Sequence, residues 1–90
     1  MASGYTVIKE DTTIYEDGNA IEGCDMTGLP EDFWALQWDG TNGHIEWVDK
    51  HNTVVTSKSE IESELGVSLP TLIERRDIRK AELETIKVPE

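Results

Sequence analysis

The chain contains few of the residues on which several classes of protein depend. It has a single cysteine, Cys24, three prolines and only 37% apolar residues among 90. One cysteine cannot form an internal disulfide, and the first thirty residues lack the basic and apolar segments of a signal peptide. The longest apolar run, residues 33–36, is far below the roughly 20 residues of a membrane span. We therefore expect a protein made in the cytoplasm and not inserted in a membrane.

Basic residues are also scarce. Eight lysines and arginines stand against nineteen acids, which gives a net charge of −11. This charge opposes the counterion release through which proteins bind phosphate backbones, so direct nucleic-acid binding is not expected. The imbalance is uneven, because residues 1–74 carry −12 and residues 75–90 carry +1. The cations are concentrated at the C-terminal end.

Patterns of catalytic and metal sites are missing as well. His44 and His51 are not accompanied by further ligands at zinc spacing, so we interpret them as solvated residues. The acidic neighbours of Cys24 disfavour a reactive thiolate. Residues 39–43 have the oxygen-bearing side chains of a calcium loop, but the chain turns back before a bidentate Glu could follow. The sequence predicts no catalytic, cofactor or metal site, and no enzyme.

The first third of the chain has the residues of β-strands. Residues 5–9 and 12–15 are rich in β-branched and aromatic side chains, and the polar pair between them predicts a hairpin. Residues 17–19, Asp-Gly-Asn, form a stronger turn signal because Gly and Asn accept positive φ. Residues 20–32 are broken by glycine and proline, and we expect a loop there with one short extended piece at 19–22.

A tryptophan-rich hairpin is the clearest element. Residues 33–38 and 44–48 read as strands, and the loop between them, residues 39–43, contains two glycines including Gly43. Alternation with a period of two predicts a core face made of Trp34, Leu36, Trp38, Ile45 and Trp47. The same rule places Phe33, Ala35, Gln37, His44, Glu46 and Val48 on a partly exposed face. Residues 53–56 are expected to add a short edge strand.

The last third of the chain is predicted to be helical. Ser59 and Glu62 fit a capping box and Gly66 a stop, which predicts a short helix over residues 60–65. Ser68 is a second N-cap, and a long helix can run from there to about Lys87. The expected fold is α+β: a small antiparallel sheet followed by one short and one long helix. It forms one domain, β-rich over residues 1–66, with the helix of residues 67–90 projecting at its distal end.

The only basic cluster lies on the long helix and has two interpretations. In the first, its cations balance the acids of the helix and of the sheet. In the second, the cluster is a docking face for an acidic protein partner, in which arginine forks provide specificity. The residues of this candidate partner-binding face are Arg75, Arg76, Ile78, Arg79 and Lys80.

Two stretches of the sequence resemble phage proteins. The first comprises Ile21-Glu-Gly23, Met26, Leu29-Pro30, Trp34-Ala-Leu-Gln-Trp38, Asp39-Gly40 and Gly43-His-Ile-Glu-Trp47. It resembles a module of small tailed-bacteriophage proteins whose genes commonly lie near tail-fibre genes and are described as tail-fibre assembly proteins. His44 stands where that pattern usually has Glu. Residues 76–85 are similar to the basic C-terminal helix of phage tail assembly chaperones, although Thr85-Ile-Lys87 replaces their terminal Thr-Asp-Trp.

Two functions remain open at this stage. The resemblance implies a phage accessory protein, active in the host cytoplasm or in the virion, that binds a tail or tail-fibre protein without catalysis or cofactor; homo-oligomers stay open. The alternative is a host-directed inhibitor whose acidic surface imitates a nucleic-acid backbone. In that case the acids Glu16, Asp17, Glu31 and Asp32 would carry the function.

Overall fold

The computed structural model describes residues 4–87, with side chains described up to residue 84. It contains one six-stranded antiparallel sheet followed by two helices, which confirms the predicted α+β fold. The strands are β1 (Tyr5–Ile8), β2 (Thr13–Glu16), β3 (Asn19–Ile21), β4 (Phe33–Trp38), β5 (Gly43–Trp47) and β6 (Thr53–Val55). The helices are α1 (Lys58–Leu65) and α2 (Leu69–Lys87).

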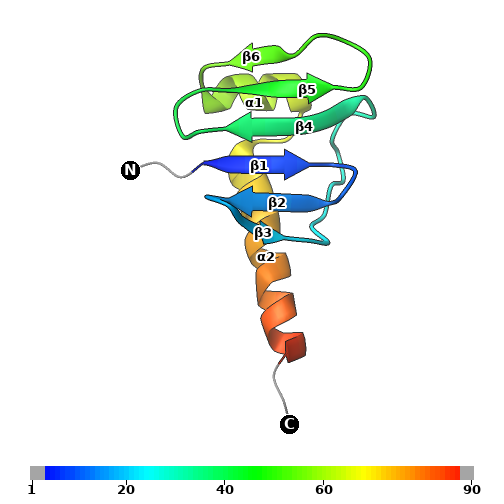
Figure 1. Ribbon diagram of the computed structural model, residues 1–90, viewed down its shortest axis with the longest axis vertical. Coiled ribbons are helices and arrows are strands. Elements are labelled where there is room, and N and C mark those ends of the chain that lie inside the picture. Colours follow the sequence, from blue (N-terminus) through cyan, green and yellow to red (C-terminus); the bar gives the residue numbers. More distant parts are fainter. Residues whose placement is uncertain (1–3, 88–90) are drawn as a thin grey trace.

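The sheet joins two three-stranded units in the order β3-β2-β1-β4-β5-β6 (Figure 1). The predicted N-terminal and central hairpins are the pairs β1–β2 and β4–β5. The two units meet where β1 pairs with β4, and there Val7 lies opposite Leu36. Val7 also lies opposite Ile14 in β2, so a continuous apolar row crosses the centre of the sheet.

Local turn chemistry fixes two of the strand connections. Between β2 and β3, Asp17 and Gly18 have φ of 51° and 89°. Two positive φ values are typical of the tight turn that matches strand twist. Between β4 and β5, the Asp39 carboxylate accepts hydrogen bonds from the backbone N–H groups of Asn42 and Thr41, both at 2.8 Å. These bonds stabilise the ionised form and hold the pKa of Asp39 below its usual value.

A β-bulge in β4 corrects the predicted faces of the central hairpin. Phe33 lies opposite Trp47 and Ala35 opposite Glu46, so the register shifts by one residue at Trp34. The extra residue reverses the alternation before it. Phe33 therefore enters the core with 2% of its surface exposed, whereas Trp34 is 42% exposed. The prediction that Trp34 faces the core is wrong, and so is the prediction that Phe33 is partly exposed.

The other predicted core residues of the hairpin are buried. They are Leu36, Trp38, Ile45 and Trp47. The rings of Phe33 and Trp47 meet edge to face, with centroids 6.3 Å apart and an interplanar angle of 80°. This geometry is favoured by aromatic quadrupoles. Phe33 thus takes the place in the core that alternation assigns to Trp34.

Both helices cover the same face of the sheet, and α2 runs across the strands (Figure 1). The N-cap of α1 is Ser57 and not Ser59, so this helix begins two residues earlier than predicted; Glu60 then bonds back to the backbone N–H of Thr56. Gly66, with φ of 76°, ends α1 as predicted. The Ser68 hydroxyl accepts from the N–H of Thr71, as expected of an N-cap of α2.

One cluster of buried side chains connects the strands with both helices. The sheet contributes residues from β1, β2, β4, β5 and β6, and the helices contribute Ile61, Leu65, Leu69 and Leu72. Leu29 and Met26, from the long loop, also pack on this cluster. The core continues across the predicted boundary at residue 66. Beyond the sheet, α2 extends past β3 (Figure 1).

Gly43 is the position in the central hairpin where a side chain has no space. A Cβ atom built there would overlap the carbonyl oxygen of Gln37 on the neighbouring strand. We expect Gly43→Ala to destabilise the fold by about 2–3 kcal/mol, because the clash is with backbone that cannot move alone. Thr41→Ala, in the same exposed loop, is the control. Urea unfolding followed by tryptophan fluorescence measures both, and equal midpoints would contradict this account.

Candidate protein-docking surface

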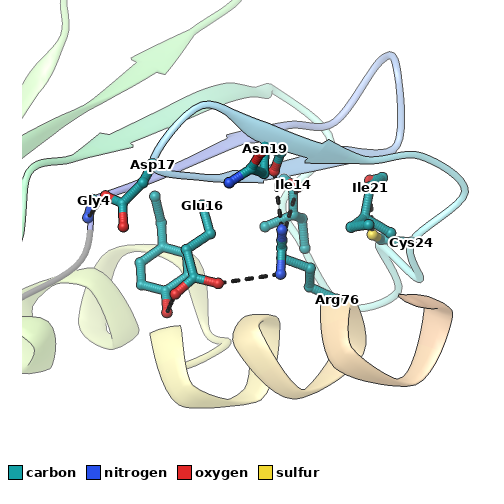
Figure 2. A network of polar contacts seen from close by, with 9 residues as sticks. Gly4, Ile14, Glu16, Asp17, Asn19, Ile21, Cys24 and Arg76 are labelled. Atoms are coloured by element: carbon teal, nitrogen blue, oxygen red, sulfur yellow. Dashed lines mark hydrogen bonds and ion pairs between the residues drawn. The ribbon is translucent and has the colours of Figure 1, made fainter. Parts of the chain in front are cut away.

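The structure places Arg76, a predicted partner-binding residue, inside the protein. Only 4% of the residue is exposed, and Figure 2 shows its guanidinium directed toward β2 and β3. It donates to the carbonyl oxygens of Ile14 at 3.3 Å and Asn19 at 3.0 Å, and it pairs with the Glu16 carboxylate at 3.2 Å. The prediction that Arg76 belongs to an exposed docking face is therefore wrong. Arg76 shares its side of α2 with the apolar residues of the first two turns.

Two further arginines of the cluster are partly engaged by the loop after β3. Arg79 donates from Nε to the Glu22 carbonyl at 3.1 Å and pairs with Glu82 at 3.2 Å. Arg75 donates to the Asp25 carbonyl at 3.3 Å. These bonds attach the middle of α2 to the loop. The interpretation in which the cations balance the protein's own acids thus fits Arg76, which pairs with Glu16, and Arg79, which pairs with Glu82. Arg75 bonds to a carbonyl oxygen instead.

A small part of the predicted docking face remains exposed on α2. Ile78 is 54% exposed and Lys80 is exposed. Ile78 borders a shallow depression of about 290 Å³, which is lined by Gly23, Asp25, Arg75, Ile78, Arg79 and Glu82. The depression therefore brings together three residues of the predicted face: Arg75, Ile78 and Arg79. Lys80 is not among the lining residues, and Arg76 is buried against the sheet.

Trp34 forms a second candidate surface, which alternation does not predict. Its indole lies at the start of β4, beside a depression of about 320 Å³ lined by Lys9, Glu10, Glu31, Phe33, Trp34 and Val48. We call these six residues the Trp34 surface. Val48 is exposed, and the backbone N–H of Lys9 donates to the Trp34 carbonyl at 3.1 Å. The surface combines an apolar floor with charged edges. The only sequence signal for it is that residues 33–36 are all apolar and cannot all face the core.

The charges of the Trp34 surface are not balanced. The Lys9 ammonium donates to the carbonyl oxygens of Pro30 at 2.8 Å and Glu31 at 3.3 Å. The side chains of Glu10 and Glu31 are exposed, and neither forms an ion pair with another residue in the described part of the chain. Two carboxylates therefore stand beside an exposed indole, while the nearby cation is held by backbone.

The uncovered face of the sheet is otherwise mixed in character. One residue from each strand forms a row across it: Ala20, Tyr15, Thr6, Gln37, His44 and Val54. The Thr6 hydroxyl donates to the Gln37 amide oxygen at 2.9 Å. Such polar pairs suit a face in contact with water. The Trp34 surface is thus an apolar region beside a largely polar face.

Most acids proposed for nucleic-acid mimicry have partners within the chain. Glu16 holds Arg76, Asp32 holds Lys50 at 3.3 Å, and Asp17 accepts from the Gly4 N–H at 2.9 Å. Of the four, Glu31 alone has a carboxylate free of such contacts with described residues. These contacts give the acids structural roles in addition to any functional one.

The titratable residues considered for chemistry are separated in the structure. His44 Nε2 lies 2.9 Å from the Glu46 carboxylate, and His51 is exposed in the loop between β5 and β6. Cys24 is buried, and burial raises the pKa of its thiol. Over the described residues, no three His, Cys, Asp or Glu side chains are grouped so that they could hold a metal ion. Neither helix, within residues 4–87, is long and apolar enough to cross a membrane.

Comparison with protein-family models, with curated proteins and with solved structures finds no match to this chain.

Removing the Arg76 guanidinium should destabilise the protein far more than removing that of Arg75. Arg76→Met leaves the carbonyl groups of Ile14 and Asn19 and the Glu16 carboxylate without their donor, and we expect a loss of about 2–4 kcal/mol. Arg75→Met removes one exposed bond and should cost below about 1 kcal/mol. Thermal or urea unfolding of the two variants gives the comparison. Similar losses in both would contradict the internal role of Arg76.

The Cys24 thiol should react slowly in the folded protein. It is buried, its pKa is raised and its Sγ lies 3.2 Å from the Ile21 carbonyl, so thiolate and access are both limited. We expect labelling by a disulfide reagent at pH 8 to be about a hundredfold slower than in denaturant. Fast labelling of the protein while its circular dichroism spectrum stays native would show that the loop after β3 opens on its own.

Proposed function

We propose that this chain is a non-catalytic phage accessory protein that binds a tail or tail-fibre protein, either during assembly in the host cytoplasm or within the virion. The observation that carries the proposal is the outward position of Trp34, which lies within the segment that carries the resemblance to tail-fibre assembly proteins. A bulge holds this large aromatic side chain partly in water. A binding partner would bury the exposed part of this side chain in an interface.

Physical reasons favour Trp34 as the centre of a protein contact. Tryptophan buries a large area and loses little conformational entropy, and it is enriched among the residues that dominate binding energy. The depression beside it gives a partner side chain a place to pack. Ile78 and Lys80 on α2 offer a second, smaller contact, which keeps part of the predicted basic face in the proposal.

A host-directed inhibitor is the second candidate function. The net charge of −11 favours it, because an acidic protein can occupy a channel built for nucleic acid. The two functions differ in their dependence on salt. A contact centred on Trp34 is mainly apolar, whereas mimicry of a phosphate backbone weakens steeply as ionic strength rises.

Binding to purified tail and fibre proteins of the presumed phage tests the first function. We expect Trp34→Ser to lower the affinity by about 30-fold or more, as for an anchor residue at a contact. Val54→Ser, on the exposed edge strand, is the matched control and should leave it unchanged. If Ile78→Ser, and not Trp34→Ser, abolishes binding of the tail or fibre protein, the contact lies on α2.

The copy number of the chain in virions distinguishes its two possible roles in the phage. Quantitative mass spectrometry of purified particles should give a fixed ratio to a tail or fibre protein if the chain is a virion component. A transient chaperone would be abundant in infected lysate and missing from particles. No binding to any tail or fibre protein would leave the inhibitor as the better explanation.

A further inference from the structure

The chain contains an internal example of how it binds a cation beside tryptophan. The Lys50 ammonium lies 4.4 Å from the centroid of the Trp47 ring, and the Asp32 carboxylate is 3.3 Å from the same nitrogen. The indole face attracts the cation and the carboxylate neutralises it. A cation, an indole and a carboxylate therefore form one complete unit at this end of the central hairpin.

The Trp34 surface has two of these three components. Its indole is exposed, and Glu10 and Glu31 provide carboxylates that no cation pairs with inside the described chain. Lys9 lines the same depression, but its ammonium donates to the Pro30 and Glu31 carbonyl oxygens and pairs with neither carboxylate in the described chain. Val48, which is exposed, adds apolar surface next to the indole. The missing component is a cation.

We propose that the Trp34 surface binds a partner segment that carries a lysine or arginine next to an aliphatic residue. The cation lies against the Trp34 indole between the carboxylates of Glu10 and Glu31, and the aliphatic side chain packs on Val48. This inference rests on the proposed function as a protein-binding module and specifies the chemistry of its partner. The excess of negative charge over the rest of the chain steers such a segment toward the protein.

Charge complementarity favours this occupant over a second copy of the chain. A symmetric contact through this surface would place the Glu10 and Glu31 carboxylates of both copies in one interface, and each copy carries a net charge of −11. Such repulsion between like charges opposes association. A phosphate backbone is disfavoured for the same reason.

A titration with short capped peptides tests the proposal by nuclear magnetic resonance. The probe contains lysine-leucine-lysine between glycines, and the matched probe replaces both lysines by norleucine. The cationic probe should shift the indole N–H signal of Trp34 and the amide signals of Glu10 and Val48, and the neutral probe should bind at least about fivefold more weakly. Trp34→Ser identifies the indole signal and should lower the affinity for the cationic probe by a similar factor.

Two double variants separate a specific site from general attraction to an acidic protein. The double variant Glu10→Gln, Glu31→Gln should bind the cationic probe about fivefold or more weakly than the unchanged protein does. Glu62→Gln with Glu64→Gln removes two exposed carboxylates from α1, changes the net charge equally and should have little effect. Equal losses in both double variants, or shifts spread over the whole acidic surface, would overturn the proposal.

The remaining outcomes are also decisive. Sedimentation of the protein alone detects self-association, and a dimer that Trp34→Ser dissociates would show that a second copy occupies the surface. Specific binding of the cationic probe without binding to any tail or fibre protein would retain this inference and reject the phage function. If the protein captures a fibre protein and Glu10→Gln with Glu31→Gln leaves that binding unchanged, the phage function is retained and this inference is rejected.

Discussion

The buried guanidinium of Arg76 is the interaction on which the closure of the fold depends. The apolar stripe of α2 ends after its first two turns, where Leu69 and Leu72 are buried. Beyond them, Arg76 reaches the backbone of β2 and β3 and pairs with Glu16, whose second oxygen accepts from the Tyr5 hydroxyl at 3.2 Å. A polar network thus continues the attachment that apolar packing begins. Because all its acceptors lie in the first hairpins, it fixes α2 across the N-terminal half of the sheet.

This attachment leaves the opposite face of the sheet without a covering element. A single layer of helices can bury only one side, so the other side must remain compatible with water. Most of this uncovered face is compatible with water because its residues are small or polar, such as Thr6 and Gln37. The bulge at Trp34 is the exception, because it brings an aromatic residue outward in order to give Phe33 its place against Trp47. The core packing of Phe33 and the exposure of Trp34 are two results of one change in register.

Elements with local signals could be predicted from the sequence. The two hairpins, the Asp17-Gly18 turn, the Gly66 stop and the long helix from Ser68 all follow from short-range chemistry, and all are present. The pairing of β1 with β4 joins segments far apart in sequence, and no local pattern specifies it. The bulge was missed because residues 33–36 are all apolar, so either register places hydrophobic side chains in the core.

The candidate site was predicted in part, for a related reason. Arg75, Ile78 and Arg79 do share one surface, but Arg76 was assigned to it by proximity in sequence. A signal for its true position was available, since Arg76 follows Leu69 and Leu72 on the same stripe of the helix. An arginine that continues an apolar stripe indicates a buried partner for its guanidinium. The Trp34 surface had no comparable signal, because its existence depends on the bulge.

The distribution of charge explains how such a small protein tolerates an exposed tryptophan and two open sheet edges. Among the cations whose side chains the structure describes, five are held by contacts within the chain: Lys9, Lys50, Arg75, Arg76 and Arg79. Many acids stay on the exterior, so copies of the protein repel one another at short range. The edge strands β3 and β6 have only three residues each, which limits edge-to-edge pairing. The arginines thus attach α2 to the sheet and to the loop after β3, and the acids left outside give the protein an anionic exterior that opposes contact between copies.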